Sequence, residues 1–78
     1  MKITIKYFGI IAESVGKTEE VLDLQQGSSL KDLKDQQIHE YKIPDADSVQ
    51  IAVNQNLGKE VILKEGDEVA FLPPFAGG

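Results

Sequence analysis

MKITIKYF, the sequence of residues 1–8, alternates apolar and polar side chains at almost every step. That period of two predicts a β-strand with one face buried and the other in solvent. Residues 18–24 (TEEVLDL) are expected to form a second strand beside the first, with residues 9–16 as a loop that includes one helical turn. The residues expected to face the core are Met1, Ile3, Ile5 and Tyr7 in the strand and Ile10, Ile11 and Val15 in the loop.

The middle of the chain predicts one main helix. Ser28 and Ser29 can cap its N-terminus, and Asp32 lies in the first turn, where the positive end of the helix dipole favours an acid. The helix is expected to end at residues 42–44 (KIP), because the residue before a proline avoids the helical region. Its apolar face, broad enough to cover a sheet, consists of Leu30, Leu33, Gln37, Ile38 and Tyr41, with His39 on the solvent side.

Three more strands are expected after the helix. They are residues 48–54, 61–63 and 68–72, with turns at residues 54–58 and 64–67. Two terminal hairpins around one helix belong to the α+β class, and a β-grasp with a mixed sheet packed on the helix is the most economical arrangement. We therefore expect a β-grasp domain over residues 1–72 and a flexible, extended tail over residues 73–78.

Composition excludes several kinds of protein. The 78 residues include no cysteine, no arginine and a single histidine, which excludes zinc–thiolate sites, a thiol nucleophile and a histidine-pair metal site. Thirteen acidic residues against eight lysines give a net charge of −5, which argues against nucleic acid or an anionic membrane surface as the partner. We expect no bound metal, a basic protein partner and a cytoplasmic location, which the absence of cysteine permits.

The tail is the most informative stretch. Pro73 and Pro74 end the last strand and favour an extended chain, and Gly77 and Gly78 carry no side chain. The five residues from Pro74 reach about 17 Å when fully extended. Such a terminus can deliver the Gly78 carboxylate into a narrow channel of a partner enzyme. If the protein carries sulfur, this carboxylate is the one place left for it, because there is no cysteine.

Residues 66–78 (GDEVAFLPPFAGG) closely resemble the C-terminal signature of the small, sulfur-carrying subunit family of molybdopterin synthase, which is ubiquitin-like in fold. The resemblance extends along the chain. It includes Tyr7-Phe8, residues 12–16 (AESVG), residues 27–30 (GSSL), Asp32-Leu33 and residues 52–54 (AVN). One departure is Phe75-Ala76, where the family more often has a smaller aliphatic residue and a serine.

The resemblance implies a chemistry for Gly78. An ATP-dependent, ubiquitin-activating-like adenylyltransferase would adenylate its carboxylate, and a sulfur donor system would convert the adenylate into a thiocarboxylate. The tail, with Ala76 and Gly77 in the channel, would then enter the large synthase subunit and give sulfur to precursor Z, forming the dithiolene of molybdopterin. The assembly implied is a heterotetramer of two small and two large subunits. We expect no permanently bound cofactor, since ATP is used by the activating enzyme to adenylate Gly78, and we expect no turnover by the chain alone.

Apolar residues near the tail are candidates for docking. Phe75 lies beyond the last strand and is expected to contact the large subunit together with Pro73 and Pro74. Phe71 and Leu72 are also candidates, and alternation along the last strand requires one of these two to face outward. The rim of this patch is expected to carry Glu65, Asp67 and Glu68, which could steer a basic partner, whereas Glu19 and Glu20 are expected in solvent.

Three other functions remain open on the residues alone. A sulfur carrier of thiamin biosynthesis shares the fold and the Gly-Gly end, although such proteins are typically shorter and lack the Leu-Pro-Pro stretch. A ubiquitin-like modifier joined to lysines of target proteins uses the same activation chemistry. An interaction module with an inert, frayed tail is the fourth reading.

Overall fold

The structure, a computed structural model, describes residues 1–57 and 62–73. Secondary structure runs in the order β1 (Lys2–Tyr7), α1 (Gly9–Val15), β2 (Glu19–Asp23), α2 (Leu30–Tyr41), the 3-10 turn η1 (Ala46–Ser48), β3 (Gln50–Val53), β4 (Asn56–Leu57) and β5 (Glu68–Leu72).

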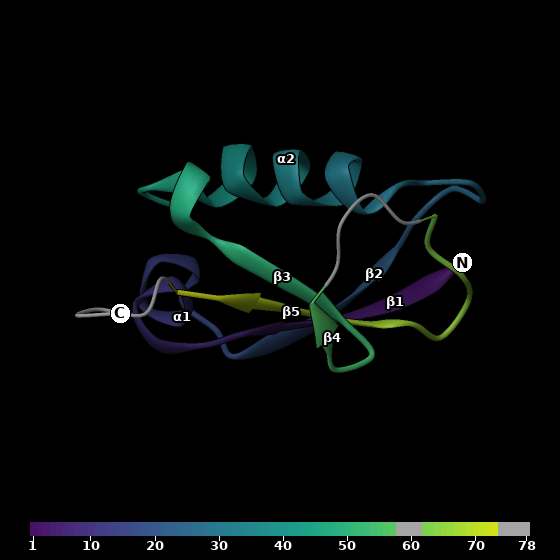
Figure 1. The fold of residues 1–78 in the computed structure, drawn as a ribbon, viewed down its shortest axis with the longest axis horizontal. Coiled ribbons are helices and arrows are strands. Elements are labelled where there is room, and N and C mark those ends of the chain that lie inside the picture. The colour runs from purple at the N-terminus through teal and green to yellow at the C-terminus, as the bar shows by residue number, and fades with distance from the viewer. Residues whose placement is uncertain (58–61, 74–78) are drawn as a thin grey trace.

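The strands of the described residues form one mixed sheet in the order β2-β1-β5-β3-β4 (Figure 1). The first and last strands, β1 and β5, are parallel neighbours at its centre, with Ile5 opposite Val69 and Tyr7 opposite Phe71. The other pairings are antiparallel. A mixed sheet with two hairpins around one main helix is the predicted β-grasp, which is confirmed.

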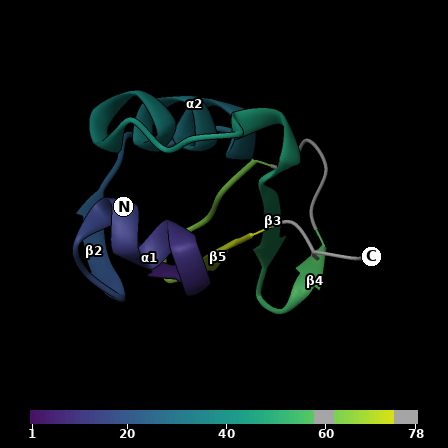
Figure 2. The same ribbon diagram turned by 90° about the vertical axis from the view of Figure 1, so that its left-hand side faces the viewer.

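Helix α2 lies across one face of the sheet, as Figures 1 and 2 show from two directions. Its boundaries match the prediction. The Ser29 hydroxyl accepts a hydrogen bond from the Asp32 amide at 3.1 Å, and Lys42 ends the helix in the left-handed region at φ 53°. Leu30, Leu33 and Gln37 are buried against the sheet.

The core lies between α2 and the sheet. Every second residue of β1 is buried, because the pleat turns Ile3, Ile5 and Tyr7 toward the helix. The alternation in residues 1–8 therefore predicted the buried face correctly. The remaining buried apolar residues are Ile11, Val15, Leu30, Leu33, Ile43, Val49, Ile51, Ala52, Val53, Leu63, Val69 and Phe71.

The prediction of a loop at residues 9–16 is wrong over most of this stretch. Residues Gly9–Val15 form helix α1, which ends where the Gly16 amide donates to the Ala12 carbonyl at 2.8 Å. Ile11 and Val15 are four residues apart, so both face the core, as expected. Ile10 instead points away from the core and is 58% exposed.

The fourth strand was misplaced. Asn54 and Gln55 both have positive φ, 50° and 72°, and make a two-residue hairpin from β3 into β4, inside the stretch predicted as a turn. Of the expected strand at residues 61–63, Val61 lies outside the described residues and Ile62 makes an isolated bridge to Ser29. The strand expected at residues 48–54 is confirmed in a shorter form, as β3.

Candidate functional site

The tail leaves the domain at the end of β5. Leu72, the last residue of this strand, is partly exposed, and Pro73 follows it. The end of β5 lies beside α1 at one end of the molecule (Figure 1). Most of the predicted site lies outside the described residues, namely Pro74, Phe75, Ala76, Gly77 and Gly78. The part that the structure describes is the surface from which those residues continue.

Two backbone features position the end of β5, from which the tail continues. The Phe8 amide donates a hydrogen bond to the Phe71 carbonyl at 3.2 Å, one residue beyond the last parallel pair of β1 and β5. The next residue, Gly9, lies directly against the Pro73 ring. A β-carbon built on Gly9 would lie 3.1 Å from Pro73 Cγ.

Phe71 does not belong to the docking surface. Its side chain is fully buried, and its ring centroid lies 5.5 Å from that of Tyr7. The pairing of Phe71 with Tyr7 and Ile51 turns it to the helix side, so Leu72 is the residue of the two that faces outward. The proposed partner contact through Phe71 is therefore replaced by a core role.

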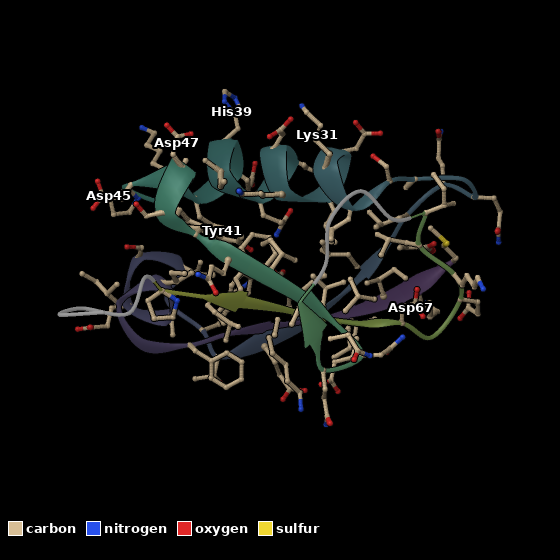
Figure 3. The ribbon with its side chains drawn as sticks, viewed as in Figure 1. Lys31, His39, Tyr41, Asp45, Asp47 and Asp67 are labelled. Atoms are coloured by element: carbon tan, nitrogen blue, oxygen red, sulfur yellow. The ribbon has the colours of Figure 1, made fainter. Side chains whose placement is uncertain are left out.

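The predicted acidic rim lies at the wrong end of β5. Glu68 begins this strand, so four residue steps, about 13 Å, separate it from Leu72. In Figure 3, Asp67 lies at the right-hand end of the molecule, whereas Asp45 and Asp47 lie at the left-hand end, which is the end where β5 finishes beside α1 in Figure 1. Its carboxylate accepts from Asn54 Nδ2 at 3.0 Å and from the Lys64 amide at 2.8 Å, and these bonds hold the pKa of Asp67 below its usual value.

Two exposed apolar side chains near the exit were missed. Phe8 is 45% exposed and Ile10 is 58% exposed, and both are adjacent in sequence to Gly9, which contacts Pro73. The parity of the first strand could have identified Phe8, because Ile3, Ile5 and Tyr7 point inward and an even-numbered residue must therefore point outward. We use the name exit patch for Phe8, Ile10, Leu72 and Pro73, the exposed or partly exposed apolar residues at the end of β5 and next to Gly9 in sequence.

A cluster of polar side chains joins α2 to the sheet, and its centre is Glu20. The hydroxyls of Tyr7 and Tyr41 donate to Glu20 Oε2 at 2.6 and 2.8 Å. Gln37 Nε2 donates to the Tyr7 hydroxyl at 2.8 Å and lies 3.3 Å from the same carboxylate oxygen. Lys17 Nζ is 3.5 Å from Glu20 Oε1. The expectation that Glu20 is a solvated surface acid was wrong.

The contacts of this cluster shift the pKa values of its members. Burial alone would raise the pKa of Glu20, but the hydrogen bonds from Tyr7 and Tyr41, with Lys17 nearby, hold it below its ordinary value. Burial, followed by the bond to Glu20, raises the pKa of Tyr7, and the bond to Glu20 raises that of Tyr41. No buried side-chain polar atom in the described part of the chain lacks a partner, which indicates that the cluster stabilises the fold.

Few groups in the described residues could do chemistry. His39 is exposed on the outer side of α2, as predicted, and Figure 3 shows it pointing away from the sheet. Within residues 1–57 and 62–73, no group of three or more histidine or acidic side chains gathers as metal ligands. Neither helix in these ranges has the length and apolarity needed to span a bilayer. The exit patch is accordingly the candidate functional surface.

Comparison with known families identifies the family of the chain. The model of the ThiS family matches residues 5–78, which include the exit patch and the whole tail. The chain belongs to the ThiS family. Two curated relatives are each named molybdopterin synthase sulfur carrier subunit. The protein of Mycobacterium tuberculosis is 38% identical over 82 residues, covering all of this chain and 99% of the relative. That of Chlamydomonas reinhardtii is 36% identical over 85 residues, with both chains fully covered.

Solved structures resemble the ThiS-family fold described here. A protein of Pyrococcus furiosus assigned as molybdopterin converting factor, subunit 1, superposes with a TM-score of 0.80 at 30% identity, over 96% of this chain and 99% of that one. In a complex of subunits 1 and 2 of molybdopterin-converting factor from Helicobacter pylori, a chain matches with a TM-score of 0.71 at 26% identity, with full coverage of both. The ubiquitin-like small archaeal modifier protein 1 of Haloferax volcanii gives 0.83 at 21% identity, with full coverage, and shows the shared fold.

Proposed function

We propose that this protein is the sulfur-carrier subunit of a molybdopterin synthase, with Gly78 as its reacting residue. The observation that carries the proposal is the end-to-end likeness, at 38% and 36% identity, to two relatives of that name. The side-chain-free Gly77-Gly78 terminus supports it, because a thiocarboxylate there needs no widening of the partner's channel.

The chemistry proceeds at the terminal carbonyl carbon. A carboxylate oxygen of Gly78 attacks the α-phosphorus of ATP in an activating enzyme, and pyrophosphate leaves. A hydrosulfide ion from the sulfur donor system then attacks the acyl carbon and displaces AMP, which leaves a thiocarboxylate. In the large subunit the thiocarboxylate sulfur bonds to a carbon of precursor Z and displaces an oxygen substituent there. Water then cleaves the C–S bond to the Gly78 carbonyl carbon, which returns the terminus to a carboxylate and leaves the sulfur on precursor Z. The small chain supplies the tethered sulfur, and the large subunit supplies the acid–base groups and the anion-binding residues.

Docking must involve more than the tail, because five or six residues bury too little surface to fix an orientation. The exit patch includes the exposed apolar side chains of Phe8 and Ile10, on either side of Gly9 in sequence, and exposed apolar residues of this kind are typical of a binding surface. We propose that it contacts the large subunit together with Phe75 and Pro74, in a heterotetramer of two small and two large subunits in the cytoplasm. The complex of subunits 1 and 2 from Helicobacter pylori supports a partner of this kind.

Intact-mass measurement tests the proposal. After incubation with an activating enzyme, ATP and a sulfur donor, the mass should rise by the difference between one sulfur and one oxygen, located in the C-terminal peptide. Deleting Gly77 and Gly78 should abolish both this change and molybdopterin formation with the large subunit. An unchanged mass with transfer activity intact, or a modification elsewhere in the chain, would contradict the proposal. Isopeptide-linked products in place of the thiocarboxylate would favour the modifier alternative.

A further inference from the structure

At the start of the tail, Pro73 lies close to Gly9. This residue has φ +56°, and a β-carbon placed on it would lie 3.1 Å from Cγ of Pro73 and 3.9 Å from both Cβ and Cδ. The first of these distances is shorter than ordinary van der Waals contact, so a side chain at position 9 would displace the proline ring by a few tenths of an ångström.

Both partners in this contact are fixed by their neighbours. On one side, the Phe8 amide bonds to the Phe71 carbonyl, and the Phe8 carbonyl accepts from the Ile11 amide at 3.1 Å, which anchors the turn from β1 into α1. On the other side, the ring of Pro73 limits rotation about its own N–Cα bond. The contact therefore joins two stiff segments, and the five remaining residues of the chain follow directly after it.

We propose that Gly9 is a positioning residue for sulfur transfer. Because Gly9 has no side chain, the Pro73 ring can pack against it, and we call this contact between Gly9 and Pro73 the seat. The seat sets the direction in which the reactive terminus leaves the domain. The proposal rests on the function proposed above. Five residues can span at most about 17 Å, so the direction in which Pro73 starts them limits where Gly78 can reach. Misplacement of a reacting group by about 1 Å can cost up to a hundredfold in rate.

A matched control exists in the same helix. Gly16, at the other end of α1, also has positive φ, 85°, but a β-carbon there meets nothing within 4 Å. Alanine at either position suffers the same kind of backbone strain, and only Gly9→Ala adds a contact with Pro73. Any effect that the two variants share is therefore strain, and the excess in Gly9→Ala reports the seat.

The test uses full-length thiocarboxylated protein and the large subunit, with single-turnover transfer to precursor Z at saturating large subunit. Gly16→Ala should retain the parent rate within about twofold, whereas Gly9→Ala should be slower by about tenfold. In the Pro73→Ala background, which removes Cγ and Cδ, adding Gly9→Ala should have no more effect than adding Gly16→Ala. An NMR spectrum gives a second readout, in which the amide signal of Leu72, far from position 9 in sequence and next to Pro73, should move in Gly9→Ala and remain in place in Gly16→Ala.

The outcomes separate this proposal from the proposed function. If the parent transfers sulfur and the two alanine variants are equally active, Gly9 is not a positioning residue, and the sulfur-carrier function stands. If the tenfold rate defect of Gly9→Ala persisted in the Pro73→Ala background, the proposal would also be wrong, because contact with the Pro73 ring could not be the cause of the defect. If the parent itself transfers no sulfur, the proposed function fails and the positioning role fails with it.

Discussion

Replacing Glu20 with alanine should destabilise the fold far more than its place on an edge strand suggests. The Glu20 carboxylate accepts the hydroxyl hydrogens of Tyr7 and Tyr41 at 2.6 and 2.8 Å, and the Tyr7 side chain is only 2% exposed. In Glu20→Ala the hydroxyl hydrogen of this buried tyrosine loses its acceptor. A buried donor left unsatisfied costs about 1–3 kcal/mol, and hydrogen bonds to a charged group are at the upper end of such values.

We therefore expect Glu20→Ala to lower the free energy of unfolding by about 2–3 kcal/mol, part of it from the lost bond to Tyr41. For a domain of this size that corresponds to a fall in Tm of about 10–20 °C. Glu20→Gln retains an oxygen that can accept from both tyrosines, and should cost about 1 kcal/mol. Glu19→Ala is the control, since Glu19 is exposed on the other face of β2 and its loss should cost less than about 0.5 kcal/mol.

Urea unfolding followed by circular dichroism measures all three variants, with calorimetric melting as a second method. The order of stability should be Glu19→Ala, then Glu20→Gln, then Glu20→Ala, with similar m-values showing that the same surface unfolds in each. If Glu20→Ala were as stable as Glu19→Ala, the cluster would contribute nothing and its hydrogen bonds would be no better than those to water.

Three further predictions concern Glu20, Phe71 and Phe75. Because the pKa of folded Glu20 lies below its ordinary value of 4.5, its contribution to stability is complete above that pH and is lost as the pH falls through the folded value. The stability difference between the parent and Glu20→Gln should accordingly shrink on acidification below pH 4.5, measured by urea titrations at several pH values; a constant difference would contradict the assigned contacts. Phe71→Ala should cost about 3–5 kcal/mol in urea unfolding, as expected for a fully buried aromatic ring. A cost below about 1 kcal/mol would place Phe71 on the surface after all. Phe75→Ala should weaken binding to the large subunit roughly ten- to a hundredfold in titration calorimetry, if burial of one aromatic ring anchors the tail. Unchanged affinity would make the phenylalanine at this position a neutral substitution.

Local patterns in the sequence determined most of the elements. Alternation assigned β1 and its buried face, because a pleat turns every second side chain the same way. Ser29 and Asp32 identified the start of α2, since the cap bond joins residues three apart in the chain. The same kind of local information failed at α1, where the bounding glycines suggested a loop and instead serve as the ends of a short helix.

The predicted functional site also has one part that the sequence assigned and one part that it did not. The reactive end, from Pro74 to Gly78, was assigned from sequence alone, because its proposed chemistry needs only a free terminus without side chains, and it lies outside the described residues. The surface around it was assigned less well. Phe8 was overlooked. The acidic turn at residues 64–67 was expected near the tail, although the turn precedes β5 and the tail follows it.

What only the tertiary structure decided are the contacts between segments far apart in the chain. Alternation along β5 allowed either Phe71 or Leu72 to face the core, and the parallel pairing of Phe71 with Tyr7 settled it. Glu20 looks like any other strand acid until Tyr7 and Tyr41 come within hydrogen-bond distance from two other elements. A side chain's burial, partners and pKa depend on its neighbours in space, and the local periodicity of a sequence carries information only about its neighbours along the chain.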